Sequence, residues 1–231
     1  MKFRYLFAAV ALACASGAQG ATVLSTASIY NTGTGSTERT TFDLNGATAI
    51  TIAATGSVVL TPPYANNPDG EGSFAIPHKV LGANGLSGIS LPSGRAGALV
   101  GVFLGATDPG SLAIAPASLS YMVSDLQFAS FSPLLAQVFF VGDGLMGAGT
   151  GASQIFYAPI GATRIAFGIA DAENYQGEPG AYYDNSRSYE VGIKPLGAVV
   201  PEPATWAMMI LGFAVIGASR RRRPVVRAAA I

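Results

Sequence analysis

The stretch AITIAATGSVVL, residues 49–60, decides the fold class of this chain. It is rich in Ile, Val and Thr, whose β-branched side chains favour extended strands, and it contains no charged residue. Asn45-Gly46 precedes it and Pro62-Pro63 follows it, and both dipeptides are typical of turns. The stretch therefore predicts a buried β-strand bounded by turns.

Similar runs recur along the chain. The chain contains 29 Gly and only 11% charged residues, and helix-forming segments are sparse. The further strand-like runs are ATVLSTASIYNT, RTTFDL, GALVGVFLG, AQVFFVGDG, SQIFYAPIGATRIAFGIAD and SYEVGIKP. This number of short strands predicts an all-β sandwich or jelly roll over residues 21–195. Residues 118–137 predict either a short helix or a loop.

The charge of the predicted β-domain argues against nucleic-acid binding. Between residues 21 and 200 there are six basic residues against twelve acidic ones, which gives a net charge of −6. Contacts to a phosphate backbone need clustered Lys and Arg, so we expect no nucleic-acid partner. An acidic domain is compatible with a cation such as calcium.

Two residue types limit the available chemistry. Cys14 is the only cysteine and lies in an N-terminal apolar run, so we expect neither a disulfide nor a thiolate site in the β-domain. His78 is the only histidine, and no G-x-S-x-G motif accompanies it. The sequence therefore favours a protein that is not an enzyme. The scattered carboxylates leave a secreted glycosidase as a less favoured alternative.

The N-terminal segment MKFRYLFAAVALACASGAQG predicts a signal peptide over residues 1–20. Lys2 and Arg4 precede an apolar run, and small residues follow it. Ala18 and Gly20 suit cleavage after residue 20. The alternatives are an uncleaved anchor and a lipoprotein signal that ends at Cys14; the apolar run is shorter than the roughly 20 residues that span a bilayer.

The C-terminal segment PEPATWAMMILGFAVIGASRRRR predicts a short hydrophobic helix at residues 204–219. It follows a linker at residues 196–203 and precedes a basic tail at residues 220–231. A 16-residue helix is about 24 Å long, which is short for a hydrocarbon core of about 30 Å. Trp206 suits a membrane interface, and the arginines predict a cytoplasmic tail, so we expect the β-domain on the far side of the membrane.

This segment resembles the PEP-CTERM sorting signal of Gram-negative bacteria. The residues that carry the resemblance are Pro201, Glu202, Pro203, Trp206, Arg220, Arg221, Arg222 and Arg223. The family implies transient anchoring in the membrane, recognition by the membrane protease exosortase and cleavage near the Pro-Glu-Pro motif. It further implies delivery to the cell surface or an exopolysaccharide matrix. A single-pass anchor without processing is the alternative.

The stretch FGIADAENYQGEPGAYYDNSRSYEVGI, residues 167–193, is the strongest candidate for a binding site. A predicted strand ends at Asp171, a polar loop follows, and Asp184 and Asn185 precede the last strand. These three oxygen-bearing side chains suit calcium, which takes six to eight oxygen ligands. Ordinary turn capping by Asp and Asn is the alternative. Tyr175, Tyr182 and Tyr183 are candidates either for stacking on a sugar or for packing on the loop.

The same stretch, with upstream runs in matching order, resembles the calcium-dependent galactose-binding lectins of the LecA type. TFDLNGATAITIAATGSVVL resembles the early strands, NNPDGEG the sugar-contact loop and GALVGVFLG the central strand. The resemblance spans most of residues 22–194 and implies a galactose-binding-like sandwich. It also implies that calcium itself coordinates two sugar hydroxyls without a chemical step.

Carried over by position, the resemblance implies a calcium site and a sugar site. The implied calcium ligands are Asp171, Asp184, Asn185 and the backbone carbonyls near Leu60 and Ala181. The implied sugar contacts are Asn67, Asp69 and Asp171, and Tyr182 is added as the aromatic candidate. Asn67 and Gly70 replace a His and a Gln of the family, which argues against a preference for galactose.

The sequence thus predicts an exported, non-catalytic, calcium-assisted carbohydrate-binding protein of the cell surface or matrix. The alternative is a structural matrix protein that has the same scaffold without a ligand site.

Overall fold

The structure is a computed structural model that describes residues 18–71, 75–76, 86–121, 128–147, 149–171, 181–196 and 208–214. The chain divides into two units. Residues 16–198 form the β-domain, and residues 1–15 together with 199–231 form the other unit. Within the second unit, the structure describes one short helix at residues 208–214. No helix among the described residues has both the length and the apolar character that a membrane crossing needs.

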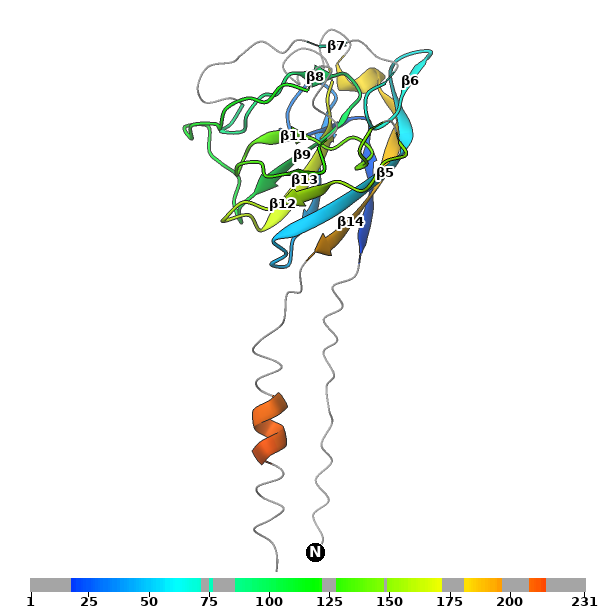
Figure 1. Cartoon of the computed structure of the whole chain (residues 1–231). Helices are drawn as coiled ribbons and strands as arrows, with labels where there is room; N and C mark the ends of the chain where they lie inside the picture. Colours follow the sequence, from blue (N-terminus) through cyan, green and yellow to red (C-terminus); the bar gives the residue numbers. More distant parts are fainter. Residues whose placement is uncertain are drawn as a thin grey trace, which may run out of the picture. The chain divides into compact units, whose positions relative to one another are not determined.

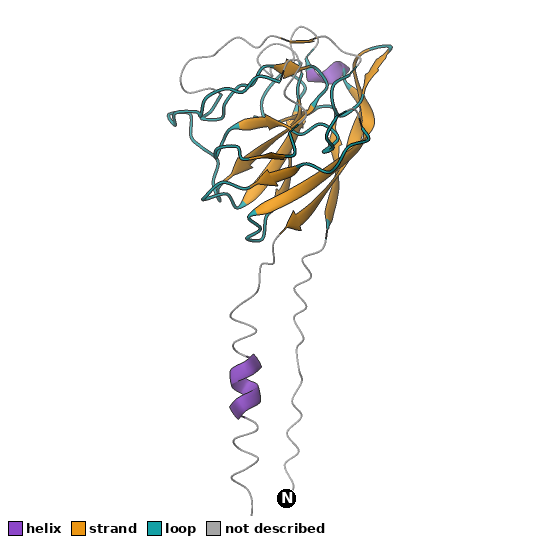
Figure 2. Ribbon diagram, in the orientation of Figure 1, coloured by secondary structure: helices purple, strands orange, loops and turns teal. Residues whose placement is uncertain are grey.

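The larger sheet of the β-domain is built around the strand predicted from AITIAATGSVVL (Figures 1 and 2). Its order is β1-β14-β5-β12-β10, and β6 pairs with β5 in addition. The strands are β1 (Gln19–Leu24), β5 (Ala49–Thr61), β6 (Tyr64–Asn66), β10 (Ser130–Phe131), β12 (Ile155–Tyr157) and β14 (Ser186–Leu196). The long antiparallel pairing of β5 with β14, from Val59↔Ser186 to Ala49↔Leu196, forms its centre.

The smaller sheet has the order β11-β9-β13-β4. Its strands are β4 (Thr40–Asp43), β9 (Leu99–Leu104), β11 (Val138–Phe140) and β13 (Arg164–Ile169). All six residues of β9 and the last five of β13 are buried, as expected for strands at the centre of a sheet with both faces covered. Two short pairs complete the domain: β2 (Ala27–Ser28) with β3 (Thr37–Glu38), and β7 (Ala75–Ile76) with β8 (Gly94–Arg95).

Aromatic side chains join the two sheets. Phe139 of β11 lies with its ring centroid 5.4 Å from that of Phe156 in β12 and 6.1 Å from that of Phe131 in β10. One continuous core contains buried residues of both sheets, including Ile50 and Phe103. The β-domain is therefore an all-β fold with two packed sheets, which confirms the predicted fold class at the level of a β-sandwich.

Strand directions give the β-domain two opposite ends. At the end that we call the terminal end, β5 begins and β14 finishes, because Ala49 pairs with both Leu196 and Tyr157. At the end that we call the loop end, β5 finishes near Leu60, β13 finishes at Ile169 and β14 begins. Since β5 has 13 residues, the two ends are separated by roughly 40 Å.

The sheet extends slightly beyond the predicted domain boundaries. β1 begins at Gln19, which pairs with Ile193. The side-chain amide of Gln19 donates to the carbonyl of Asp43 at 3.0 Å. At the other boundary β14 continues through Leu196, so the first residue of the predicted linker belongs to the strand. Both chain segments outside the β-domain therefore connect to its terminal end.

Candidate functional site

The candidate site lies at the loop end, where β13 finishes and β14 begins. Asp171 follows β13 by two residues. Its backbone position is held from the preceding residue, because Ala170 donates to the carbonyl of Ala98 at 2.9 Å and accepts from the amide of Gly97 at 2.6 Å. Asp171 is only 5% exposed. β13 therefore delivers a buried carboxylate to this end of the sandwich.

Asn185 meets Asp171 from the other sheet. The Nδ2 group of Asn185 donates to Oδ2 of Asp171 at 2.9 Å and to the carbonyl of Ser25 at 3.0 Å. The Oδ1 atom of Asn185 is buried and has no hydrogen-bond partner among the described residues. A buried amide oxygen without a partner is costly, because it loses its hydration without compensation. The pair thus combines a carboxylate with an amide oxygen whose bonding capacity is unused.

The short helix η1 (Tyr182–Asp184) places Asn185 at the start of β14. Ala181 directly precedes η1 and has φ 62°. The backbone amide of Tyr182 donates to the carbonyl of Thr34 at 2.9 Å. Gly35 passes so close to η1 that a Cβ there would lie 2.7 Å from Cβ of Tyr183. A glycine is therefore required at position 35 for the turn to pack over the helix.

The structure corrects the expected role of Tyr182. Its side chain is fully buried, and its hydroxyl lies 3.5 Å from the carbonyl of Ile169. Burial, followed by the nearby Asp171 carboxylate, raises the pKa of this phenol, so Tyr182 is neutral. A buried ring has no free face for a sugar. The neighbouring Tyr183 is 71% exposed, so its ring is accessible. Tyr175 lies outside the described residues.

The remaining predicted calcium ligands are Leu60, Ala181 and Asp184, and they differ in position and in burial. Ser186 pairs with Val59, so the register places Asn185 next to Leu60 across the two central strands. Ala181 is buried at the entry to η1, and Asp184 is exposed at its end. Among the described residues there is no group of three or more His, Cys, Asp or Glu side chains arranged to hold a metal. Carbonyl and amide oxygens would thus have to supply much of the coordination.

The polar side chains of the predicted sugar-contact loop form hydrogen bonds within the loop. Oδ1 of Asn67 accepts from the amide of Glu71 at 2.9 Å, and Nδ2 of Asn67 donates to the Glu71 carboxylate at 3.2 Å. Arg95 lies 4.0 Å from the same carboxylate. The Asn67 side chain therefore serves the turn of its own loop.

Asp69 is buried and contacts a residue that the sequence analysis did not single out. Its Oδ1 atom accepts from the backbone amide of Asp143 at 3.0 Å. Burial is the main reason that the pKa of Asp69 rises to about 6, and burial also raises the pKa of Asp143. A Cβ at Gly142 would come within 2.2 Å of the Asp69 carboxylate, so the turn after β11 wraps closely around it. No local sequence signal connects residues 69 and 143.

The hydroxyl of Tyr189 links β14 to this loop. It lies 2.7 Å from the carbonyls of Asn67 and Gly97 and 3.2 Å from that of Asn66. Burial, followed by the charge of Asp69, raises the pKa of Tyr189, which keeps the hydroxyl protonated as a donor. Three carbonyls thus converge on one hydroxyl, and Tyr189 fixes the loop relative to the strand that carries Asn185.

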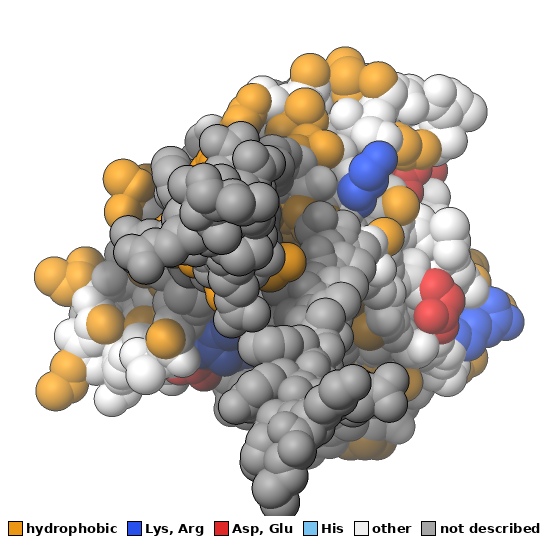
Figure 3. Space-filling model, turned by 90° about the horizontal axis from the view of Figure 1, so that it is seen from below, with side chains coloured by type: hydrophobic (Ala, Val, Ile, Leu, Met, Phe, Trp, Pro, Cys, Tyr) orange, Lys and Arg blue, Asp and Glu red, His pale blue; other side chains and the backbone are white. Residues whose placement is uncertain are grey.

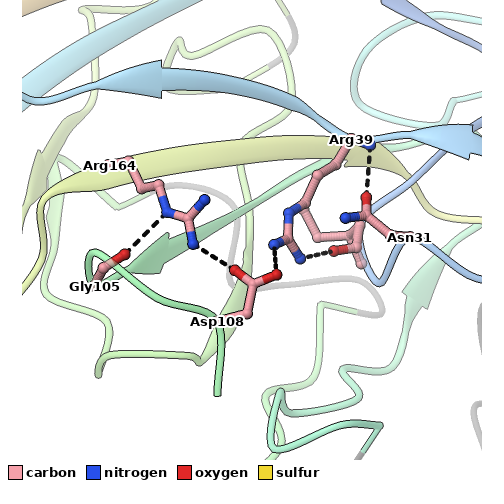
Figure 4. A network of polar contacts seen from close by, with 6 residues as sticks. Asn31, Arg39, Gly105, Asp108 and Arg164 are labelled. Carbon is pink, nitrogen blue, oxygen red and sulfur yellow. Dashed lines mark hydrogen bonds and ion pairs between the residues drawn. The ribbon is translucent and has the colours of Figure 1, made fainter. Parts of the chain in front are cut away.

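A second polar network joins Asp108 to two arginines (Figure 4). The carboxylate of Asp108 contacts Arg39 with one oxygen and Arg164 with the other, the latter at 2.5 Å. Arg39 is almost fully buried and donates further to the carbonyl of Ile29 at 3.0 Å. Arg164 donates to the carbonyl of Gly105 at 2.9 Å. The network fixes the loop after β9 to β13 and to the segment before β4.

Several predictions fall outside the described residues. These are most of the predicted signal peptide, His78, and every residue of the predicted sorting signal from Pro201 to Arg223 that carries the resemblance. The prediction that the protein is not an enzyme is not tested by the structure and stays a prediction.

A family model for the PEP-CTERM protein-sorting motif matches residues 199–223. The match confirms the prediction for the C-terminal segment: the chain carries the sorting motif of exported proteins that exosortase processes and that are directed to the cell surface. Characterised proteins and solved structures, compared with the whole chain, give no match. The resemblance of the β-domain to LecA-type lectins therefore stays a prediction.

Proposed function

We propose that the chain is an exported, non-catalytic carbohydrate-binding protein that uses calcium at the loop end of its β-domain. The observation that carries the proposal is the meeting of Asp171 and Asn185, with the buried Oδ1 atom of Asn185 left without a described partner. Carboxylate and amide oxygens are the ligand types that calcium prefers. A cation there would satisfy the Asn185 oxygen and neutralise the buried carboxylate.

The proposed calcium shell draws on five residues of the segments that end or begin at the loop end. Asp171 and Asn185 would bind through side chains, the backbones near Leu60 and Ala181 through carbonyls, and Asp184 from the end of η1. Bound calcium would supply coordination positions for two hydroxyls of a sugar. The side-chain amide of Asn185 would have to turn over to present Oδ1, because its Nδ2 group faces Asp171 in the structure.

The sugar would lie on the exposed side of this shell, against Tyr183. An exposed phenol ring is a suitable platform for the apolar C–H face of a pyranose. Asp69 and Asn67 would act on the sugar indirectly, since their side chains hold the adjacent loop. We also propose that the β-domain is a galactose-binding-like or jelly-roll sandwich. Its two packed sheets, with the candidate site at one end, support this type of fold.

Export and anchoring complete the proposal. The PEP-CTERM motif supports processing by exosortase at the Pro-Glu-Pro tripeptide. Before processing, residues 204–219 would lie in the inner membrane, with Trp206 at one interface and the arginines in the cytoplasm. The chain leaves the β-domain at its terminal end, which is opposite to the end that contains the candidate site.

A glycan array tests the proposal. The β-domain, residues 16–198, should bind a subset of glycans in calcium, lose that binding in a chelator and lose it in Asp171→Asn, which removes the charge but preserves an acceptor for Asn185. Asp43→Asn changes an exposed carboxylate at the terminal end and is the matched control. Binding that survives both chelation and Asp171→Asn would contradict the proposed site.

One observation favours the structural alternative. The Asn185 amide already bonds to Asp171 and Ser25, so the two residues connect the sheets without a metal. A matrix protein of this kind would bind no glycan, and Asp171→Asn would change only its stability. The array and a thermal unfolding curve of the same variant separate the two functions.

A further inference from the structure

Exposed apolar side chains gather at the terminal end, opposite to the candidate site. Ile160 is fully exposed, Leu134 is 57% exposed, Tyr157 is 46% exposed and Leu135 is 37% exposed. We call these four residues the apolar rim. Single exposed apolar residues are common on soluble proteins, whereas apolar residues that gather on one surface mark an interaction site.

The strand register brings the rim together at this end. Tyr157 pairs with Ala49, the residue that also pairs with Leu196, so Tyr157 lies beside the point where the chain leaves the β-domain. β10 runs parallel to β12, so the residues that follow each strand, including Leu134 and Ile160, continue toward the same end. A Cβ at Gly161 would lie 3.8 Å from Cδ2 of Leu135, which joins the two turns.

The view of this end from below shows hydrophobic side chains at several places around the described surface (Figure 3). Basic side chains lie at the same end. Lys194 is exposed on β14 near its exit, and Arg164 opens β13. Arg164 is paired with Asp108, whereas Lys194 has no carboxylate within 4.0 Å among the described residues. The end thus combines aliphatic, phenolic and cationic groups, the composition of surfaces that lie at lipid headgroups.

The length of the connecting chain favours the membrane surface as the partner of the apolar rim. Eight residue steps separate Leu196 from Ala204, so even a fully extended connection spans at most about 28 Å. With residues 204–219 in a bilayer, the terminal end is held within that distance of the headgroups. We propose that the apolar rim docks on the outer surface of the membrane while the protein is still anchored. This inference rests on the anchoring that is part of the proposed function.

Docking would keep the connection close to the headgroups. The Pro-Glu-Pro tripeptide, residues 201–203, lies within that connection, so a docked domain would keep it close to the membrane in which the protease is embedded. After cleavage the tether is lost, and the small rim alone holds the domain weakly, because few apolar groups insert. The rim would thus assist processing without preventing release.

A labelling experiment on the full chain tests the docking. An environment-sensitive NBD dye is placed on Ile160→Cys or, as the matched control at the loop end, on Tyr64→Cys, each in a Cys14→Ser background that removes the only native cysteine. The chains are reconstituted in phosphatidylcholine vesicles with or without phosphatidylcholine that is spin-labelled near the headgroup. The single tryptophan, Trp206, reports separately whether the C-terminal segment is inserted.

Docking predicts that the dye at residue 160 shifts to the blue, brightens several-fold and loses most of this emission in spin-labelled lipid, while the dye at residue 64 changes in neither respect. Quenched Trp206 with an aqueous dye at residue 160 would overturn the docking and leave the anchor intact. Unquenched Trp206 would overturn both. A blue shift at residue 160 that grows with protein concentration without lipid would show self-association and would also overturn the docking.

A variant provides the second test. With the dye on Tyr157→Cys, the double change Leu134→Ser and Ile160→Ser removes two apolar rim groups and should abolish most of the blue shift while Trp206 remains quenched. Leu24→Ser replaces an exposed apolar residue at the loop end and should leave the shift unchanged. Equal shifts in the double variant and this control would contradict a role for the rim.

Discussion

Asp69 shows at the scale of one residue how burial turns a carboxylate into a pH-dependent element. The pKa of Asp69 is about 6 in the folded chain against an ordinary value of 3.8, mainly because burial disfavours the charged form. Between these two values the folded chain binds more protons than the unfolded chain. Stability is therefore highest below the unfolded pKa and falls as the pH rises through about 6.

We predict that Asp69→Asn flattens this dependence. The amide oxygen of Asn can still accept the Asp143 N–H, and no charge is buried at neutral pH. The variant should gain up to about 3 kcal/mol relative to the native chain between pH 4 and pH 7.5, as measured by urea unfolding at both pH values. The same pH slope in both proteins would show that the Asp69 carboxylate is not responsible.

Tyr189→Phe isolates the contribution of one hydroxyl. The Tyr189 hydroxyl is the shared partner of the carbonyls of Asn66, Asn67 and Gly97. Its removal leaves buried acceptors with fewer donors, so we expect a loss of about 1–3 kcal/mol in the free energy of unfolding. Tyr183→Phe alters an exposed ring on η1 and should change stability by less than about 0.5 kcal/mol. Similar losses in the two variants would contradict the proposed link.

At the scale of the element, the turn after β11 depends on Gly144. This residue has φ +81°, and a Cβ there would lie 1.9 Å from the carbonyl oxygen of Ile52 in β5. Gly149 has a similar φ of +76°, but the nearest atom to its Cβ is 3.5 Å away. The two glycines therefore share the backbone strain of a substitution and differ in the space available.

Gly144→Ala should destabilise the β-domain by more than Gly149→Ala, for which about 1–2 kcal/mol of backbone strain is expected. Thermal unfolding followed by circular dichroism measures the difference. Equal melting temperatures for the two variants would show that the turn does not pack against β5 as described.

The long elements were predictable from the sequence, and the contacts between short ones were not. The runs that became β5, β9, β13 and β14 have β-branched and aromatic residues between turn signals, which is the local signature of strands. For residues 118–137 the sequence predicts either a helix or a loop, whereas the structure has the two-residue strand β10 there. The pairing of β10 with β12 is a tertiary contact with little local signal. The burial of Tyr182 likewise depends on how η1 packs.

The same limit applies to the candidate site. That Asp171 and Asn185 lie at neighbouring strand ends followed from the order of the runs, because residues before and after a loop come close in an antiparallel sandwich. The contact of Asp69 with Asp143 joins residues far apart in the chain, and the Asp108 network depends on a buried arginine at residue 39. Neither contact has a periodic pattern that a sequence could reveal.

At the scale of the whole molecule, the proposed function assigns separate tasks to the two ends of the β-domain. The terminal end receives the chain from the sorting segment, and the loop end contains the candidate site, roughly 40 Å away along β5. A binding site at the far end of a tethered domain remains accessible before and after processing. Sorting and binding should therefore be separable by mutation.

Glu202→Ala tests this separation. Replacement of the acidic residue in the Pro-Glu-Pro tripeptide should prevent processing, so the chain accumulates uncleaved in the membrane fraction of cells that contain exosortase. Immunoblotting of membrane and surface fractions detects the change, and the purified variant should keep the glycan binding of the native chain. Unchanged processing would show that the motif acts without this carboxylate.

The central claim, a calcium site between Asp171 and Asn185, is tested most directly by calorimetric titration of the metal-free β-domain with calcium. We expect saturable one-site binding in the native domain and in Asp43→Asn, and none in Asp171→Asn. No binding heat in the native domain across temperatures, or equal affinity in the native domain and Asp171→Asn, would contradict it.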